Sequence, residues 1–338
     1  QAILALAGRS GATELALRQG KLYSPDLQRT ETIEEGDEPL NLDGATAIIT
    51  GGLGYLGLHV ARQLSSVHKV SRLVLVGRSA ANENAQASIK ELQDKGIHVE
   101  CVQADVSDYG QVYKVMADIA SSLKVVVHGA GTLDDGLLVN QTEESIEKVL
   151  APKAVGAWNL HRAALALKLD LSLFVCFSSL TATLGSPGQT NYSMANAFLD
   201  GLCAHRRAKS LPAISMAWGP WLGGGMAAKL DESEVKRLQN QGISSLDPKE
   251  AKKLFSLIIE KDVAFQLIAS LDFTKMATAF PSDLVPPPLA RVIKVTRSSN
   301  VAPKDDGLKR RLLALPIAER SNELLATLRQ EAARMLLW

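Results

Sequence analysis

The stretch Ala47-Ile48-Ile49-Thr50-Gly51-Gly52-Leu53-Gly54-Tyr55-Leu56-Gly57 decides the fold of this chain. It opens with a short apolar run, which is typical of a buried strand. Gly52, Gly54 and Gly57 follow with the spacing G-x-G-x-x-G, and apolar residues then recur at helical spacing. Between a strand and a helix, such glycines let the backbone approach a pyrophosphate at the helix N-terminus. The stretch therefore predicts a dinucleotide-binding turn, with a purely structural turn as the alternative.

Apolar runs and helical patterns alternate along the rest of the chain. We expect strands at residues 73–76, 98–102 with 104–106, 125–128, 171–177, 213–218 and 265–268. We expect helices between them, including residues 85–95, and further helices at 231–239 and from 248 to near 260. Near-continuous apolar strands that alternate with helices imply a parallel sheet covered on both faces. The sequence predicts a Rossmann-like, doubly wound α/β fold.

Length and composition exclude several classes of protein. Of the 338 residues, 46% are hydrophobic and 22% are charged, as in ordinary globular proteins. The formal net charge of +1 gives no basic surplus that would favour nucleic acid. No apolar run approaches the ~20 residues that a membrane helix needs. We therefore expect neither a nucleic-acid partner nor a membrane partner.

The cysteines Cys101, Cys176 and Cys203 show no paired spacing and lie in apolar or helical surroundings. We expect free buried thiols in a reducing, cytoplasmic compartment, without a disulfide or a metal site. The chain begins at Gln1 with neither an initiator Met nor a secretory pattern, so we expect a fragment of a longer polypeptide.

The first residues do not share the α/β pattern. Residues 1–43 contain a candidate hairpin with its turn at Gln19-Gly20, followed by an acidic linker from Glu31 to Pro39. An arm packed on the main domain and a fragment of a separate subdomain both fit this segment.

The region after the α/β pattern also differs from it. The Gly-rich piece Gly223-Gly224-Gly225-Met226 precedes the charged helix at 231–239. Glycine hinges beside a helix suggest a lid, and an ordinary surface loop fits equally well. Residues 296–310 are typical of a linker, and the stretch from Leu308 to Trp338 is amphipathic and helical, with an interruption at Pro316.

The end of the second strand distinguishes between cofactors. NAD-binding proteins usually place a carboxylate there to hold the ribose hydroxyls, whereas this chain has Arg78 and Ser79. A guanidinium and a hydroxyl suit a 2′-phosphate through charge-assisted hydrogen bonds, so we expect NADP(H). Asp105 is a candidate for contact with the adenine edge, with helix capping or turn formation as alternatives.

Hydroxyl groups lie on both sides of a Gly- and Pro-containing loop. Ser178 and Ser179 close an apolar strand, and Tyr192 opens the next helical pattern, so two hydroxyls can be aimed at one carbonyl. A free Tyr has a pKa of ~10 and needs a cation to act as an acid near neutral pH. One helical turn after Tyr192, where such enzymes commonly carry Lys, this chain has Asn196. The best candidate for the cation is Lys153, with a solvated lysine as the alternative.

Several motifs of the chain resemble one family closely. They are Thr50-Gly51-Gly52-Leu53-Gly54-Tyr55-Leu56-Gly57, Gly77-Arg78-Ser79, His128-Gly129-Ala130-Gly131, Pro152-Lys153, Ser178-Ser179, Tyr192-Ser193-Met194-Ala195-Asn196 and Ala217-Trp218-Gly219-Pro220-Trp221. Together they resemble the ketoreductase domain of modular type I polyketide synthases, within the extended short-chain dehydrogenase superfamily. The resemblance runs in unbroken order from about Asp43 to Leu271. In that family Lys and Asn exchange positions relative to ordinary short-chain dehydrogenases, which accounts for Asn196.

The resemblance implies a reductase that uses NADPH to reduce a β-ketoacyl thioester delivered by an acyl carrier protein. The catalytic residues would be Tyr192, Ser179, Lys153 and Asn196. The cofactor would be bound by Thr50, Gly51, Gly52, Gly54, Tyr55, Gly57, Arg78, Ser79, Asp105, Val106, Gly129, Ala130, Gly131 and Pro220. The substrate would contact Leu133, Asp134, Asp135, Leu184, Gln189 and Met226.

The resemblance also implies a stereochemistry. Leu133-Asp134-Asp135 matches the motif of B-type ketoreductases, which produce a D-configured 3-hydroxyl. A-type members carry Trp at the position of Leu184. Both markers imply a D-configured product.

The same resemblance implies how the chain is divided. Residues 1–43 would be the tail of a structural subdomain, 44–295 the catalytic subdomain, and 296–310 a linker. Residues 311–338 would be the truncated start of an acyl carrier protein, and other domains of the synthase would be partners.

Two other functions fit parts of the sequence. One is a redox-inactive domain that is structural or epimerises the α-carbon, although such domains usually lose part of the nucleotide loop or the Tyr. The other is a free-standing short-chain dehydrogenase, which Asn196 disfavours. Binding of NADPH distinguishes the first alternative from an active reductase.

Overall fold

The computed structural model describes residues 16–30, 40–225, 231–279, 287–289, 292–293, 312–316 and 319–326. Met226, the expected acidic linker and the expected linker at 296–310 lie outside these residues. Among the described residues the chain divides into two compact units. The larger consists of Arg29–Leu230 and Ile243–Leu271, and the smaller of Gln1–Gln28, Asp231–Gly242 and Asp272–Trp338. The expected domain boundaries stay a prediction.

A parallel sheet of seven strands, in the order β10-β8-β7-β6-β3-β4-β5, organises the larger unit. The strands are β3 (Thr46–Thr50), β4 (Arg72–Gly77), β5 (His98–Gln103), β6 (Leu123–His128), β7 (Leu173–Ser179), β8 (Ile214–Trp218) and β10 (Phe265–Ile268). β3, β7 and β8 are buried along their whole length. The Rossmann-like, doubly wound α/β fold expected from the apolar runs is confirmed.

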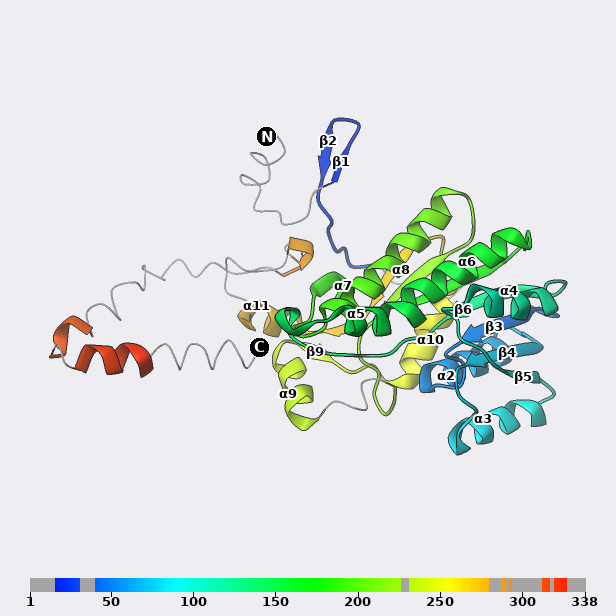
Figure 1. The fold of residues 1–338 in the computed structure, drawn as a ribbon, viewed down its shortest axis with the longest axis horizontal. Helices are drawn as coiled ribbons and strands as arrows, with labels where there is room; N and C mark the ends of the chain where they lie inside the picture. Colours follow the sequence, from blue (N-terminus) through cyan, green and yellow to red (C-terminus); the bar gives the residue numbers. More distant parts are fainter. Residues whose placement is uncertain are drawn as a thin grey trace. The chain divides into compact units, whose positions relative to one another are not determined.

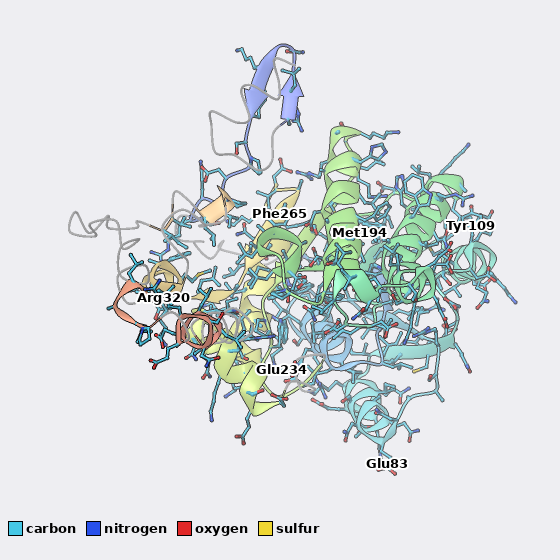
Figure 2. All side chains as sticks on the ribbon, turned by 60° about the vertical axis from the view of Figure 1, so that its left-hand side comes forward. Glu83, Tyr109, Met194, Glu234, Phe265 and Arg320 are labelled. Carbon is cyan, nitrogen blue, oxygen red and sulfur yellow. The ribbon has the colours of Figure 1, made fainter. Side chains whose placement is uncertain are left out.

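Helices cover both faces of this sheet (Figure 1). On one face α2 (Tyr55–Ser66), α3 (Glu83–Asp94) and α10 (Pro248–Ile259) share a core with the sheet. On the other, the core includes α4 (Tyr109–Asp118), α6 (Gly156–Ala166) and α8 (Thr190–Ala208). Figure 2 shows Glu83 and Tyr109, which begin helices on the two opposite faces. The two cores explain why the central strands read as continuous apolar runs.

Shorter elements complete the larger unit. They are η1 (Leu138–Asn140), α5 (Glu143–Leu150), the π-helical turn η2 (Ala151–Val155), α7 (Thr181–Leu184), and the antiparallel pair β9 (Ile243–Ser244) and β11 (Ser270–Leu271).

The order of the strands places the candidate site. The chain builds β4 and β5 on one side of β3, and then β6, β7 and β8 on the other. The direction of winding therefore reverses between β3 and β6. In open α/β sheets ligands bind at this reversal, beyond the carboxyl ends of the strands. Here those ends are Thr50 and His128, which pair with each other in the strand register.

Two expectations about the third strand are wrong. β5 ends at Gln103, so residues 104–106 form a loop and turn rather than part of a strand. Cys101 is exposed, whereas Cys176 and Cys203 are buried as expected. β5 is the last strand of the seven-stranded sheet, and four of its six residues are exposed. The apolar neighbours of Cys101 in sequence therefore do not indicate burial of its own side chain.

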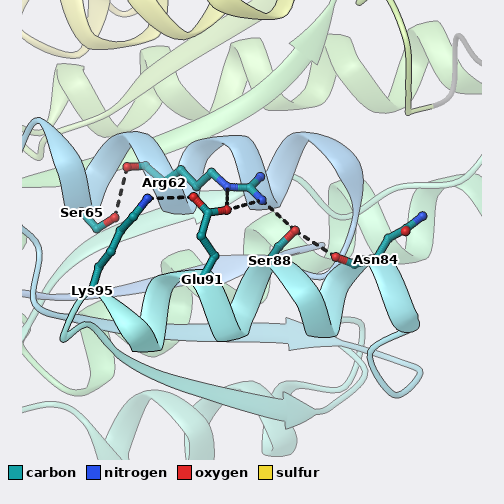
Figure 3. A network of polar contacts seen from close by, with 6 residues as sticks. All are labelled: Arg62, Ser65, Asn84, Ser88, Glu91 and Lys95. Carbon is teal, nitrogen blue, oxygen red and sulfur yellow. Dashed lines mark hydrogen bonds and ion pairs between the residues drawn. The ribbon is translucent and has the colours of Figure 1, made fainter.

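A polar network on the surface joins α2 to α3 (Figure 3). Glu91 accepts from Arg62 Nε at 3.1 Å and forms an ion pair with Lys95 Nζ at 2.7 Å. Arg62 Nη2 also donates to Ser88 Oγ at 2.8 Å. Hydrogen bonds from Lys95 and Arg62 lower the pKa of the exposed Glu91.

The smaller unit contains the hairpin expected at Gln19-Gly20. Its strands β1 (Ala16–Arg18) and β2 (Lys21–Tyr23) pair antiparallel. Helix α9 (Glu232–Asn240) confirms the expected charged helix, and α11 (Phe273–Ala279) and η4 (Pro287–Leu289) follow later. Near the end, residues 312–314 and 319–326 are helical on either side of Pro316. Among the described residues, no helix combines the length and apolar character needed to cross a bilayer.

Candidate active site

The glycine-rich turn after β3 is packed too tightly for side chains. Gly51 has φ +67°, and a Cβ there would lie 2.8 Å from Gly129 O, across the gap between β3 and β6. A Cβ on Gly52 would lie 2.6 Å from Ile49 O, and one on Gly57 2.4 Å from Gly51 O. These glycines let α2 begin directly above the strand end, as a dinucleotide-binding turn requires.

The N-terminus of α2 has the features of an anion site. Its N-cap, Gly54, makes no side-chain cap, and its first turn carries no acidic residue. The first N–H groups of a helix have no partner within the helix and attract negative charge. Arg78 and Ser79, at the end of neighbouring β4, are exposed. The chemistry of these groups fits a phosphorylated dinucleotide.

Tyr55 holds the Gly-rich loop against this turn. Its hydroxyl donates to Leu222 O at 3.0 Å, and a Cβ on Gly224 would lie 2.3 Å from the Tyr55 ring. The loop therefore rests on the start of α2, after the partly buried Pro220. The expected role of the loop as a lid stays a prediction, because Met226 lies outside the described residues.

Ser179, the last residue of β7, has its oxygen already occupied as an acceptor. Thr181 donates to Ser179 Oγ twice, from its backbone N at 3.2 Å and from its Oγ1 at 3.1 Å. The hydroxyl proton of Ser179 is left to donate. Ser178, in contrast, donates to Asn196 O at 3.3 Å inside the fold. Sequence reasoning missed Thr181, whose signal is only its nearness to Ser179.

Tyr192 lies in the first turn of α8 with its phenol beside Ser179. Burial raises the pKa of Tyr192, while hydrogen bonds with Asn196 and Ser179 act in the opposite direction. Asn196, one turn later, donates from Nδ2 to Tyr192 O at 2.8 Å. Its Oδ1 is buried and has no hydrogen-bond partner among the described residues. Such an orphaned acceptor is costly unless a bound group or a water satisfies it.

Lys153 brings a buried amine to the two hydroxyls. It lies in the π-helical turn η2 and is 3% exposed. Its Nζ donates to Phe177 O at 2.8 Å and lies 5.4 Å from the centroid of the Tyr192 ring. Burial lowers the pKa of Lys153 to about 8, while Cys176 and Asp200 act in the opposite direction. The alternative of a solvated lysine is therefore excluded.

The segment with the Leu-Asp-Asp motif is fastened to the start of α8. Gly136 N donates to Gly188 O, and Gln189 Nε2 to Asp135 Oδ2, each at 2.8 Å. The buried Asn191 donates from Nδ2 to Asp134 O at 2.8 Å. Sequence reasoning did not identify Asn191. Leu133 and Leu184 are both partly buried.

Some expected cofactor residues have other partners. The Thr50 side chain is fully buried, and its Oγ1 lies 2.7 Å from His128 Nδ1. Asp105 Oδ1 accepts from Ser107 N at 2.9 Å and Ser107 Oγ at 2.7 Å, which matches the turn-forming alternative. Val106 is buried, and Gly129, Ala130 and Gly131 are partly buried beyond β6.

Near the carboxyl ends of the central strands, the structure thus brings together an uncapped helix terminus, two hydroxyls and a buried amine. Two hydroxyls side by side can hydrogen-bond one carbonyl oxygen, and a cation beside them favours transfer of a proton from the phenol. This arrangement suits reduction of a carbonyl or the reverse oxidation of an alcohol.

Known proteins of one family are similar to this chain. The family model of the KR domain matches residues 45–223. Mycoketide-CoA synthase of Mycobacterium tuberculosis is 40% identical over 301 residues, which cover 86% of this chain and 7% of the synthase. The phenolphthiocerol synthesis polyketide synthase type I Pks15/1 of Mycobacterium marinum is 37% identical over 296 residues, with 86% and 14% covered. The chain therefore spans only a small part of these relatives.

A solved structure of A-type ketoreductases from a modular polyketide synthase is also similar. It superposes with a TM-score of 0.78 at 31% identity, covering 86% of this chain and 62% of that one. Fold, site geometry and a family match over more than half of the sequence lead to one assignment: this chain belongs to the KR domain family, the ketoreductase domains of polyketide synthases.

Proposed function

We propose that this domain reduces a β-ketoacyl thioester with NADPH and produces a D-configured β-hydroxyacyl thioester. The single observation that carries the proposal is the pairing of Ser179 with Tyr192. Ser179 Oγ already accepts two hydrogen bonds, so Ser179 acts as a donor, and the Tyr192 phenol lies beside it. Both groups are donors, as the carbonyl oxygen of a ketone under reduction requires.

NADPH, when bound, supplies the hydride. Ser179 and Tyr192 hold the carbonyl oxygen, and Tyr192 transfers its proton to that oxygen as negative charge develops there. The Lys153 ammonium, 5.4 Å from the Tyr192 ring centroid, stabilises the phenolate that remains. Asn196 keeps its buried Oδ1 available to accept from a donor in this site.

The cofactor would be held by backbone and side-chain groups together. The turn at Gly51–Gly57 and the uncapped start of α2 would bind the pyrophosphate. Arg78 and Ser79 would bind the 2′-phosphate that distinguishes NADPH from NADH. Exchange of Arg78 for Gln should therefore weaken binding of NADPH more than that of NADH, as measured by fluorescence titration.

We further propose that an acyl carrier protein delivers the substrate and that a larger cytoplasmic synthase contains this domain. Coverage of 7–14% of the curated relatives supports membership in a longer polypeptide. The D configuration rests on Leu133-Asp134-Asp135 and on Leu184 at the position of the A-type Trp. A chiral product assay with synthetic β-ketoacyl thioesters tests it, and an L-configured alcohol would overturn the stereochemical assignment alone.

Exchange of Tyr192 for Phe tests the reaction itself. Loss of the proton donor should lower the reduction rate by about 10²-fold or more, while NADPH still binds. Tyr113→Phe, on the exposed surface of α4, is the matched control and should keep wild-type turnover. If Tyr192→Phe reduced β-ketoacyl thioesters at the wild-type rate, the assignment would be wrong. If the wild-type domain bound no NADPH, the alternative of a redox-inactive domain would be correct.

A further inference from the structure

A buried histidine links the nucleotide turn to the backbone of Lys153. His128 is the last residue of β6 and has no exposed surface. Its Nδ1 lies 2.7 Å from Thr50 Oγ1, and its Nε2 lies 2.8 Å from the backbone oxygen of Lys153. Three segments distant in sequence are thereby joined through one imidazole.

These partners determine which ring nitrogen carries the proton. A backbone carbonyl only accepts, so Nε2 of His128 must donate to Lys153 O. In a neutral ring Nδ1 is then the acceptor, and Thr50 Oγ1 donates to it. Burial and the nearby Lys153 charge lower the pKa of His128 to about 3, which agrees with a neutral ring. His128 therefore has one tautomer with both nitrogens satisfied.

The bond from His128 reaches the chain where its helix is irregular. Residues Ala151–Val155 form a π-helical turn between α5 and α6. Such turns are rare and lie frequently at functional sites. The next residue, Gly156, packs directly on the imidazole, since a Cβ there would lie 3.1 Å from His128 Cε1 and 2.7 Å from Val106 Cγ2. A larger residue would push the turn away from the ring.

We propose that His128 is a positioning residue, which fixes the Lys153 backbone in the π-helical turn and so aims Nζ at Phe177 O and Tyr192. The inference rests on the proposed function for its kinetic effect, although the geometry itself is independent of it. Without His128, the Lys153 carbonyl loses its side-chain partner and keeps the backbone bond from Gly156 N, so the turn that carries the amine is held less firmly. Displacement of a reacting group by about 1 Å can cost ~10²-fold in rate.

The chain offers a matched control in a second buried histidine. His68 also has no exposed surface, with Nδ1 2.9 Å from Leu40 O and Nε2 2.9 Å from Ser256 Oγ. Like His128 it bonds one backbone carbonyl and one hydroxyl, but neither partner belongs to the candidate site. Leucine at either position should cost similar stability, and only the change at His128 should disturb the site.

The test compares His128→Leu, His128→Asn and His68→Leu by thermal unfolding, and by turnover at saturating NADPH and temperatures where each is folded. We expect His128→Leu to lose about 10²-fold in kcat, and His128→Asn, which keeps an amide donor, to recover part of it. His68→Leu should keep kcat. Equal kcat in the two Leu variants would overturn the proposal.

Nitrogen-15 NMR of the folded wild-type domain tests the same proposal without turnover or variants. We expect a proton on His128 Nε2 and none on Nδ1, and the opposite tautomer would overturn the proposal even if His128→Leu failed to fold. The Nζ resonance of Lys153 should move in His128→Asn and not in His68→Leu. A wild-type domain that showed this tautomer but reduced no β-ketoacyl thioester would contradict the proposed function and leave the positioning of Lys153 by His128 intact.

Discussion

The surface network of α2 and α3 and the buried hydrogen bond of Lys153 both involve lysine, but one lies in water and the other inside the fold. In the first, Glu91 bonds Arg62 and Lys95 at the edge of solvent (Figure 3). In the second, Lys153 has no anion at hydrogen-bond distance among the described residues and donates to a backbone carbonyl within the fold. Water screens the charges in the first region and is excluded from the second.

The difference between the two regions appears in the pKa values of Glu91 and Lys153. In the surface network Lys95 and Arg62 stabilise the ionised form of Glu91 and lower its pKa. In the buried path desolvation destabilises the ionised form of Lys153 and lowers its pKa to about 8. Pairing thus determines the first shift and burial the second. The buried amine is therefore poised to lose its proton near physiological pH, and this property can be tested.

The largest effect should come from exchange of Lys153 for Met. Loss of the cation beside Tyr192 should lower the reduction rate by about 10²–10⁴-fold, the usual range for a residue in acid–base catalysis. The melting temperature should stay the same or rise, because a buried charge is replaced by an apolar chain of similar volume. Lys95→Met is the control in the exposed network and should keep the rate. A fall in rate that merely followed a fall in stability would contradict the catalytic role.

The pH dependence of the wild-type rate should report the ionisation of Lys153. Lys153 is protonated below its folded pKa of about 8, so kcat should fall as pH rises through this value. The shift also makes the folded state gain stability relative to the unfolded chain between about pH 8 and 10.5, where only the unfolded chain still binds the proton. A pH–rate profile and pH-dependent unfolding measure the two effects, and both should be absent in Lys153→Met.

Exchange of Thr181 for Val should have a moderate effect. The Val keeps the backbone bond to Ser179 Oγ and removes the one from Oγ1. One neutral hydrogen bond contributes about 1 kcal/mol, so we expect a fall in kcat of about five- to tenfold, with KM for NADPH unchanged. A rise in KM for NADPH would show that Thr181 acts on the cofactor.

Exchange of Asp200 for Asn should move the alkaline limb of the pH profile without abolishing the reaction. Asp200 accepts from Ser215 Oγ at 2.6 Å and its charge raises the pKa of Lys153. Because Asn has no charge, the fall in rate should begin at lower pH than in the wild type. Asp170→Asn, in an exposed pair with Lys124, is the control. A limb that stayed in place would exclude Asp200 as a support of the Lys153 charge.

The smallest effect should come from exchange of Glu91 for Gln. Exposed ion pairs contribute about 0–1 kcal/mol, so the free energy of unfolding should fall by less than about 1 kcal/mol at low salt. The folded pKa of Glu91 is lowered, so its contribution is present above its unfolded pKa and is lost as pH falls through the folded value. Urea unfolding at pH 7 and at acid pH measures this, and a change in NADPH affinity would contradict a purely structural network.

Local patterns in the sequence account for most of the fold. Fully buried strands such as β3 and β7 read as apolar runs, and the glycine spacing from Gly51 to Gly57 indicates a tight turn that leads into α2. The error at Cys101 has a different origin, because nothing local shows that β5 lies at the edge of the sheet. Position in a sheet depends on pairing across the whole chain, which a run of residues does not encode.

For the candidate site, the sequence identified the side chains expected to react, and the structure added their hydrogen-bond partners. Ser179, Tyr192 and Lys153 were found by type and by resemblance, and the structure brings them together. Thr181 and His128 were not recognised as partners, because their bonds depend on rotamers, tautomers and contacts between segments far apart in sequence. Asn191 looks in sequence like any polar residue at a helix start.

The fastening between residues 134–136 and the start of α8 has a consequence for exchange of segments between related domains. Gly136, Asp135 and the carbonyl of Asp134 each bond a residue of 188–191. A graft that replaced only the Leu-Asp-Asp segment would leave Gln189 and Asn191 facing a foreign sequence. The two segments should therefore be transferred together, with the cuts made outside Leu133–Gly136 and outside Gly188–Asn191, so that the hydrogen bonds between them are kept.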